Sequence, residues 1–317
     1  NGERAMRELE FSASMATITK GADYPRDAIR ELWDIILLNQ FHDILPGTSI
    51  AAVYDDSDAD YAKLFAAMQD KQGLLQSALN TVCPTSDRQL RVVNFTSQRR
   101  DGELVEFITN DDISGLAIRT QSGRNTVQYI VHADGTTSFA APLNDIPAMG
   151  WCAVQLVQSE EAPSTSLSVS KNHLENDLIA VLFDEAGEIT SIYDKTSARE
   201  LVQSGKRANQ LIAYEDKPQN YDAWDIDHYF EEKCWPLSET SALIEVVETG
   251  PHRAALKISR RYARSHVVQV ISLQDGQKQI EFDTEIDWQE RQTLLKTGFS
   301  LDLNVSETRA EIQFGHV

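Results

Sequence analysis

The chain has 317 residues, which is long enough for two or three domains whose cores need no covalent cross-links. Its 49 acidic and 29 basic side chains give a formal net charge of −20, which opposes a broad attraction to nucleic acid or to an anionic membrane surface. We therefore expect neither nucleic acid nor a membrane as a partner, and an acidic surface that keeps a cytoplasmic protein soluble.

The cysteines also bear on the compartment. Cys83, Cys152 and Cys234 are odd in number and far apart in sequence, which suits a reducing compartment. None belongs to a CxxC pair, so a zinc site built on cysteine is not expected. No uncharged apolar run reaches the ~18 residues that a membrane span requires. Because the sequence begins at Asn1 and not at Met, we interpret the chain as a mature product or a piece of a longer protein.

Helical periodicity fills the first 84 residues. Apolar residues recur at spacings of three and four over residues 2–19. The same spacing after residue 47 predicts one long helix to about Val82, with four aspartates in its first turns. Together with a central helix between them, these segments predict a three-helix bundle over residues 1–84.

The central helix carries the most informative stretch of sequence. The Pro-Gly pair at 46–47 is expected to stop it, and a hydroxyl at 48–49 can cap the next helix. On a helical wheel of ~100° per residue, Ile35 and Leu38 form a strip apart from the main apolar stripe, and His42 extends that strip. His42 is therefore expected to point away from the bundle, toward whatever covers the second side.

Beyond residue 84 the periodicity changes to two, which predicts antiparallel strands separated by turn signals. We expect a small antiparallel β domain over residues 85–162, a polar junction within residues 160–166, and a β-sandwich over residues 163–317 that is truncated at its C-terminal end. The fold class is α+β multidomain. The predicted strands centre on residues 90–93, 104–107, 127–131, 154–156, 178–182, 189–193, 242–246, 255–259, 268–272, 280–286 and 310–314.

Two stretches could carry chemistry. The first is His42 followed by Asp43, which on spacing alone is more often a helix cap or a partly buried imidazole than a metal site. No second histidine lies three or four residues away, so a metal site built on His42 must draw its other ligands from elsewhere.

The second stretch, residues 215–231, interleaves carboxylates with aromatic rings. Aromatic faces stack on the C–H side of sugars and carboxylates accept hydrogen bonds from hydroxyls, so this composition suits carbohydrate recognition. An ordered surface loop pinned by aromatic packing is the structural alternative. Asp225 and Asp227 could also form an acid–base pair, although alternation along an extended chain does not favour their meeting.

A family resemblance changes this interpretation. Residues 39–48, Asn-Gln-Phe-His-Asp-Ile-Leu-Pro-Gly-Thr, resemble the NQFHD-x-LPG-[ST] signature of glycoside hydrolase family 38, the α-mannosidases, and especially its bacterial and cytosolic branch. Later segments are similar to the same branch in the same order: residues 92–95, 175–195, 215–225, 287–291 and 311–317. One departure is Gln289, where relatives tend to have His, and we assign no function to it.

The resemblance implies that the active site is shared between this chain and an N-terminal domain that it lacks. Family members have an N-terminal α/β barrel-like domain, then a helical bundle, then β-sandwich domains, and this chain matches only the last two parts. One zinc ion is held by two His and two Asp, of which His42 would be the final ligand. The nucleophile and the general acid/base would lie in the missing N-terminal catalytic domain, so no catalytic residue is expected here. Asp43 would bind sugar hydroxyls beside the metal, and Tyr221, Trp224 and Asp225 are expected to approach the sugar.

The resemblance thus implies the C-terminal portion of a zinc-dependent retaining α-mannosidase that hydrolyses terminal α-mannosides in mannose metabolism. We expect the piece alone to be inactive and its His42 to be without zinc. The expected partners are a mannoside or a mannose-containing oligosaccharide, the missing domain and a possible second copy. A non-catalytic carbohydrate-binding or scaffold module is the alternative.

Overall fold

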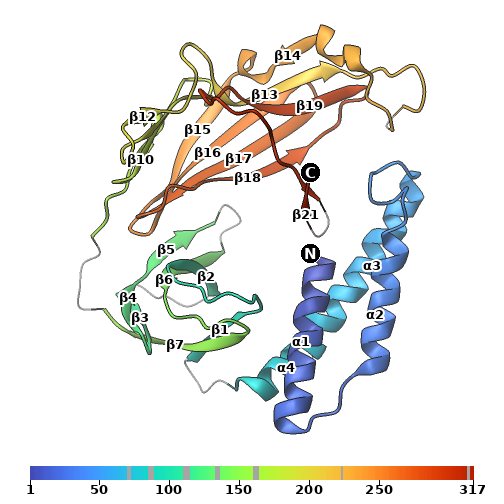
Figure 1. Cartoon of the computed structure of the whole chain (residues 1–317), viewed down its shortest axis with the longest axis vertical. Helices are drawn as coiled ribbons and strands as arrows, with labels where there is room; N and C mark the ends of the chain where they lie inside the picture. The colour runs from blue at the N-terminus through green and yellow to red at the C-terminus, as the bar shows by residue number, and fades with distance from the viewer. Residues whose placement is uncertain are drawn as a thin grey trace. The chain divides into compact units, whose positions relative to one another are not determined.

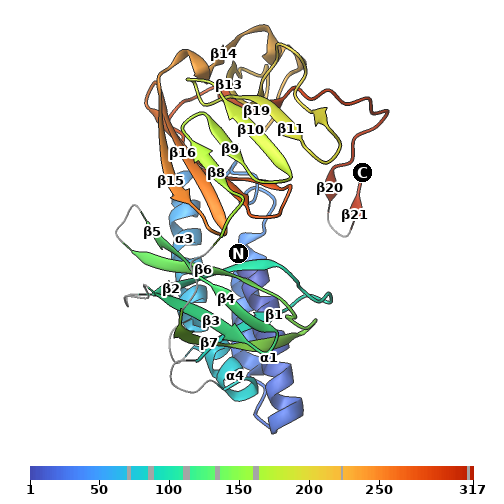
Figure 2. The same cartoon turned by 90° about the vertical axis from the view of Figure 1, so that its left-hand side faces the viewer.

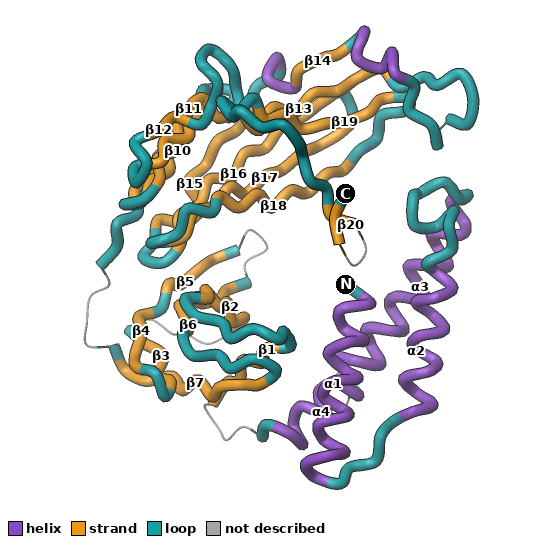
Figure 3. Tube along the Cα trace, in the orientation of Figure 1, coloured by secondary structure: helices purple, strands orange, loops and turns teal. Residues whose placement is uncertain are grey.

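A computed structural model describes residues 1–69, 73–84, 89–109, 115–132, 136–159, 164–222, 224–312 and 315–317. Parts of three predicted features lie outside these residues, namely residues 160–163 of the polar junction, residue 223 of the aromatic stretch and residues 313–314 near the chain end. The chain divides into two compact units, Asn1–Ala162 with Ala223–Asp225, and Pro163–Asp222 with Ile226–Val317. Figure 1 follows the chain by colour and Figure 3 by type of structure.

The described part of the first unit begins with four helices packed around one core: α1 (Gly2–Lys20), α2 (Arg26–Asn39), α3 (Ala51–Gln69) and α4 (Leu74–Val82). Met6, Leu9, Ile36 and Leu64 are fully buried in that core. Gly21 ends α1 in the left-handed conformation that glycine adopts without steric cost. Among the described residues, no helix is both long and apolar enough to cross a membrane.

The prediction of one long third helix was wrong. It is divided into α3 and α4, and Gly73 precedes the first residue of α4. Leu75 and Leu79 of α4 join the bundle core, and α4 packs mainly against α1. Leu75 and Leu79 keep helical spacing with or without a break, so local periodicity does not reveal it.

The second helix also ends earlier than predicted, at Asn39. Its side-chain amide donates to the carbonyl of Ile35 (2.9 Å), and Phe41 N–H bonds to the carbonyl of Leu38 (3.3 Å), which tightens the last turn. Pro46 follows this end, and a proline cannot continue the helix. His42 therefore lies on a turn, and not on a helical strip.

A small antiparallel β domain completes the first unit. Its strands are β1 (Gln89–Asn94), β2 (Glu103–Thr109), β3 (Leu116–Thr120), β4 (Gly123–Thr126), β5 (Gln128–Val131), β6 (Thr137–Leu143) and β7 (Gly150–Gln158). They form two sheets, ordered β1-β7-β3-β4 and β2-β6-β5. Phe95 joins this domain to the bundle, because its carbonyl accepts from the Arg7 guanidinium (2.6 Å) and its ring meets Phe11 edge-on at 5.8 Å.

The second unit is a β-sandwich, as expected (Figure 2). One sheet is ordered β14-β13-β11-β10-β9-β8, with β12 beside β11 and β19 beside β13; the other is β15-β16-β17-β18. Val181, Ile189, Leu256 and Ile271 are buried between them. The strands are β8 (Ser168–Ser170), β9 (His173–Glu175), β10 (Ile179–Phe183), β11 (Ile189–Asp194), β12 (Arg199–Glu200), β13 (Ala208–Glu215), β14 (Cys234–Pro236), β15 (Ala242–Thr249), β16 (Arg253–Tyr262), β17 (Ser265–Gln274), β18 (Ile280–Asp287) and β19 (Thr293–Phe299).

Four short elements remain in the described part of the second unit. Two 3-10 helices, η1 (His228–Glu232) and η2 (Leu237–Glu239), lie before and after β14. A two-stranded sheet of β20 (Glu311–Ile312) and β21 (Gly315–His316) lies near the chain end. The predicted strand at 310–314 is therefore shorter than expected in its described part.

The bundle core gives a direct test of this packing. Ile36→Ala should destabilise the helical bundle by about 2–5 kcal/mol, because Ile36 is fully buried. Leu37→Ala is the matched control, because the Leu37 side chain is 60% exposed. Its replacement should lower the free energy of unfolding by less than about 1 kcal/mol. Urea unfolding followed by helical circular dichroism measures both values. Equal losses for the two variants would contradict the assigned orientation of α2.

Candidate functional site

His42 is presented to solvent on the turn between α2 and α3. Its side chain is 71% exposed and that of Asp43 is 44% exposed, and His42 Nε2 lies 3.6 Å from Asp43 Oδ2. This distance allows an ion pair when the imidazole is protonated but is too long for a hydrogen bond. The Phe41 ring lies beside the imidazole, with centroids 4.3 Å apart. The ring nitrogens are therefore accessible to a ligand.

The backbone of this turn is fixed by the carbonyl oxygen of Asp43. It accepts from the N–H and the hydroxyl of Thr48 (both 3.2 Å), from the hydroxyl of Ser49 (2.9 Å) and from the hydroxyl of Tyr54 (3.2 Å). Ser49 N–H in turn donates to the Tyr54 hydroxyl oxygen (3.0 Å). Four donors on one oxygen restrain the peptide that joins the two candidate residues. The side chains of His42 and Asp43 therefore leave the chain from a well-defined backbone.

The hydrogen bonds to the Asp43 carbonyl oxygen differ from what the sequence predicts. The hydroxyls of Thr48 and Ser49 donate back to Asp43, where capping of α3 was expected. Tyr54, which lies inside α3, was not anticipated at all. Its only sequence signal is a tyrosine placed one turn into a helix that follows a hydroxyl-rich turn, and that signal is weak.

The surface around the turn is apolar. Five large side chains are between 54% and 73% exposed: Leu37, Leu38, Phe41, Leu45 and Ile50. The exposure of Leu38 agrees with a strip that faces away from the bundle. Ile35, which was expected on the same strip, is half-buried and packs against the bundle core.

The ligand chemistry of the turn suits part of a zinc site. Zinc binds imidazole nitrogen and carboxylate oxygen and takes four ligands in closed sites. Within the described residues, no group of three or more His, Cys, Asp or Glu side chains could hold a metal ion. His42 and Asp43 therefore offer suitable ligand atoms, but fewer than a closed zinc site takes.

The second candidate region is the loop between β13 and η1, and Asp227 anchors it. The Oδ2 atom of Asp227 accepts from the Gln219 N–H (2.8 Å) and from the Tyr229 hydroxyl (2.6 Å). The same hydroxyl reaches the carbonyl of Lys217 (3.2 Å). The Tyr229 hydroxyl and the Gln219 N–H hold the pKa of Asp227 below its usual range, because both stabilise the carboxylate. These bonds give Asp227 a role in holding the loop.

The tip of this loop exposes aromatic side chains. Tyr221 is 74% exposed and Trp224 is 54% exposed, and Asp225 is also exposed. Tyr221 has φ of 55°, in the left-handed region that a bulky residue rarely adopts. Such strain persists only where the surrounding structure enforces it, and it is common at ligand-binding positions. The three predicted residues are thus all exposed, and Tyr221 has a strained backbone.

Asp216, at the base of the loop, was not singled out from the sequence. Its Oδ1 atom is buried and has no hydrogen-bond partner among the described residues. Burial raises the pKa of this carboxyl, and the Asp222 and Asp227 carboxylates raise it further. The loop therefore contains two carboxyl groups whose pKa values are shifted in opposite directions.

Two family models match the chain in order. The model of the alpha mannosidase middle domain matches residues 1–81, and that of the glycosyl hydrolases family 38 C-terminal domain matches residues 174–317. The chain is 27% identical to alpha-mannosidase 2C1 of Homo sapiens over 321 residues and 25% identical to alpha-mannosidase G of Dictyostelium discoideum over 320 residues. These matches cover 99% and 91% of this chain but only 29% of each relative.

A solved structure is also similar. The crystal structure of an alpha-mannosidase from Enterococcus faecalis V583 matches with a TM-score of 0.66 at 16% identity, over 92% of this chain and 41% of that one. At this identity the likeness supports the fold. The chain spans less than a third of the length of the curated relatives named above.

The loop anchor can be tested by titration. Tyr229→Phe should raise the pKa of Asp227 toward its ordinary value, because the variant removes a donor to the carboxylate. In the native chain this carboxylate stabilises the fold above its unfolded pKa of about 3.9, and the contribution is lost as pH falls through the lower folded value. Carboxyl NMR titration measures the pKa of Asp227 in the native chain and in the variant. Tyr221→Phe at the exposed tip is the control, and an unchanged pKa in Tyr229→Phe would contradict the anchor.

Proposed function

The chain belongs to glycoside hydrolase family 38, and we propose that it is the middle and C-terminal part of a zinc-dependent retaining α-mannosidase. The observation that carries the proposal is that two domain models of this family match in order, with His42 and Asp43 exposed on an ordered turn inside the first match. We propose domain boundaries at 1–84, 85–162 and 163–317 for this part. The substrate class is a terminal α-mannoside.

His42 is the proposed zinc ligand of this part. Its exposed imidazole lies on a restrained backbone, so it can meet ligands from another domain with little loss of conformational freedom. The remaining ligands belong, in this proposal, to the N-terminal catalytic domain of the parent enzyme. When bound, zinc would supply a Lewis acid that holds neighbouring hydroxyls of the mannose. The exposed apolar side chains around the turn are consistent with a contact to that domain.

Asp43 is the proposed partner of the sugar hydroxyls. Its carbonyl oxygen is occupied by donors of the turn, whereas in its carboxylate Oδ1 accepts from the Thr48 hydroxyl (3.2 Å) and Oδ2 lies 3.6 Å from His42 Nε2, too far for a hydrogen bond. Oδ2 therefore has capacity to accept from a hydroxyl beside the imidazole. A sugar bound through His42 and Asp43 would be oriented by both residues.

The loop with Tyr221, Trp224 and Asp225 is the proposed second contact with the carbohydrate. The aromatic faces suit the C–H side of a sugar ring, and the Asp225 carboxylate suits a hydroxyl. The anchor at Asp227 restrains the loop, so less entropy is lost when a sugar binds.

The proposed reaction requires two further carboxyl groups. In retaining hydrolysis a carboxylate attacks the anomeric carbon while a carboxylic acid protonates the leaving oxygen, and water then releases the glycosyl intermediate. We assign both groups to the N-terminal catalytic domain, so this chain binds and orients the sugar. A cytoplasmic location is also proposed, and it is supported by Cys83, Cys152 and Cys234, which form no disulfide.

His42→Ala in the complete parent enzyme tests the proposed ligand. Zinc content and aryl α-mannoside hydrolysis should fall together, by more than the ~100-fold that loss of an outer-shell partner costs. His266→Ala, at an exposed position on β17, is the matched control and should change neither. The 317-residue chain alone should not hydrolyse the mannoside. Turnover by that chain that disappears in His42→Ala would contradict the assignment.

Trp224→Ala tests the loop. The substitution should raise KM for a mannoside about 3- to 10-fold with little change in kcat, because an aromatic contact contributes about 0.5–1.5 kcal/mol. Trp235→Ala on β14 is the control, since that ring is 41% exposed but lies outside the loop. An unchanged KM in Trp224→Ala would remove the loop from the proposed site.

A further inference from the structure

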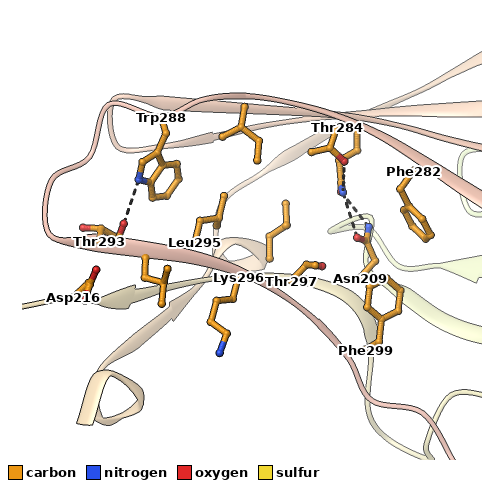
Figure 4. Close-up of a pocket in the computed structure, with 14 residues that line it drawn as sticks. Asn209, Asp216, Phe282, Thr284, Trp288, Thr293, Leu295, Lys296, Thr297 and Phe299 are labelled. Atoms are coloured by element: carbon orange, nitrogen blue, oxygen red, sulfur yellow. Dashed lines mark hydrogen bonds between the residues drawn. The ribbon is translucent and has the colours of Figure 1, made fainter. Parts of the chain in front are cut away.

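The sandwich of the second unit contains a cavity of about 660 Å³ between its two sheets. Figure 4 shows its lining, which comes mainly from β18, β19 and the segment that joins them. Phe282, Ile286, Trp288, Leu295 and Phe299 make most of the surface apolar. Ile286 and Phe299 are 49% and 44% exposed, so the cavity opens at the side of the sandwich. An opening with this lining leaves large apolar side chains in contact with water.

Both strands that border the opening have an unpaired edge. Among the described residues, β18 pairs only with β17, and β19 pairs only with β13. The rings of Phe282 and Phe299 meet at 5.7 Å, so the two strands approach one another across the cavity. A free strand edge presents a row of backbone N–H and C=O groups that can pair with another strand.

The side chains of β18 alternate between two chemical classes. Phe282, Thr284 and Ile286 line the cavity. The intervening positions carry a row of carboxylates, Glu281, Asp283, Glu285 and Asp287, which must project from the opposite face of the sheet. Asp283, Glu285 and Asp287 are exposed, and among the described residues no ion pair includes any of the four. Two of these carboxylates accept from neutral amides, Glu281 from Gln279 (3.2 Å) and Asp287 from Gln289 (2.5 Å).

We propose that the free edge of β18 binds an extended polypeptide strand that alternates aliphatic and basic side chains. The added strand would form hydrogen bonds with the free backbone N–H and C=O groups of β18, as in other cases of strand addition. Aliphatic side chains beside Phe282, Thr284 and Ile286 would close the cavity. Lysine or arginine side chains at the intervening positions would lie opposite the carboxylate row, where opposite charges on neighbouring strands attract.

Two other occupants fit less well. A second copy of this chain pairing β18 with β18 would bring two carboxylate rows together, and like charges on paired strands repel. A small apolar ligand could fill the cavity but would leave the backbone edge unpaired and the carboxylates without basic partners. The combination of edge, cavity and charge therefore favours a basic, amphipathic strand.

The strand is assigned to the remaining polypeptide of the parent enzyme, and this assignment rests on the proposed function. The named relatives are more than three times as long as the region matched here, since the match covers 29% of each. A strand supplied by the same polypeptide gains from a high effective concentration at the edge. We infer that the edge of β18 holds part of the parent enzyme onto its sandwich.

The binding mode is tested with the 317-residue chain and the peptide acetyl-Thr-Val-Lys-Val-Arg-Leu-Lys-Thr-amide. Hydrogen exchange read by mass spectrometry should show saturable slowing of at least ~10-fold over residues 280–287 when the peptide binds. A peptide attracted by charge alone would bind without protecting these amides, and that result would overturn the proposal. Absence of protection at about 1 mM peptide would overturn it as well.

Charge-reversal variants test the carboxylate row. The double variant Asp283→Lys with Glu285→Lys should weaken peptide binding at least ~10-fold, because two attractive contacts become repulsive. Glu245→Lys is the matched control, since Glu245 is an exposed carboxylate on β15 at the opposite edge of the same sheet. Thermal unfolding of each variant checks that the sandwich is intact. Equal binding by the double variant and the control would overturn the role of the row.

The source of the strand is tested in the complete parent enzyme. The amides of residues 280–287 should exchange slowly there without added peptide. Fast exchange of these amides would overturn the assignment of the strand to the same polypeptide. Neither exchange measurement depends on zinc or on hydrolysis. Failure of this inference is thus distinguishable from failure of the proposed function, which is read from His42→Ala.

Discussion

One backbone oxygen, the carbonyl of Asp43, restrains the turn on which the candidate site depends. Buried side chains of α2 and α3 fix where the two helices lie, but they leave the connecting residues without a core of their own. Donors from Thr48, Ser49 and Tyr54 converge on that oxygen and hold the turn. Because the restraint acts through the backbone, the side chains of His42 and Asp43 remain accessible. Rigidity and exposure are thus combined at the same place.

The helical part of the fold could be predicted well, except where distant contacts decide it. The spacing of apolar residues gives α1 almost to the residue, and Gly21 marks its end. It does not give the break before α4, because Leu75 and Leu79 follow the same helical spacing whether or not the chain turns back onto α1. Pro46 marks the end of α2 only approximately, because the helix ends at Asn39, about two turns before the proline.

Strand prediction failed where burial removes the alternation. Residues 138–141 of β6 are all buried, so the strand shows no polar side, and it was missed. In β13 the buried Asn209 pairs with Gln269 across the sandwich, which disguises a core position as a polar one. The candidate site shows the same limit. Spacing alone favours a helix cap or a partly buried imidazole at His42, and only the family motif indicates a ligand. The supporting role of Tyr54 depends on a contact that no motif encodes.

Part of the excess of acidic residues in this chain lies in one row of carboxylates on β18. An exposed strand beside an apolar cavity would readily pair with another copy, and the same backbone groups cannot distinguish a correct partner from a wrong one. Charge supplies that distinction, because the row from Glu281 to Asp287 repels an identical strand and attracts a basic one. The interaction weakens in salt where the carboxylates are exposed, but backbone pairing and burial in the cavity do not. Charge therefore selects the partner, and the cavity and the edge hold it.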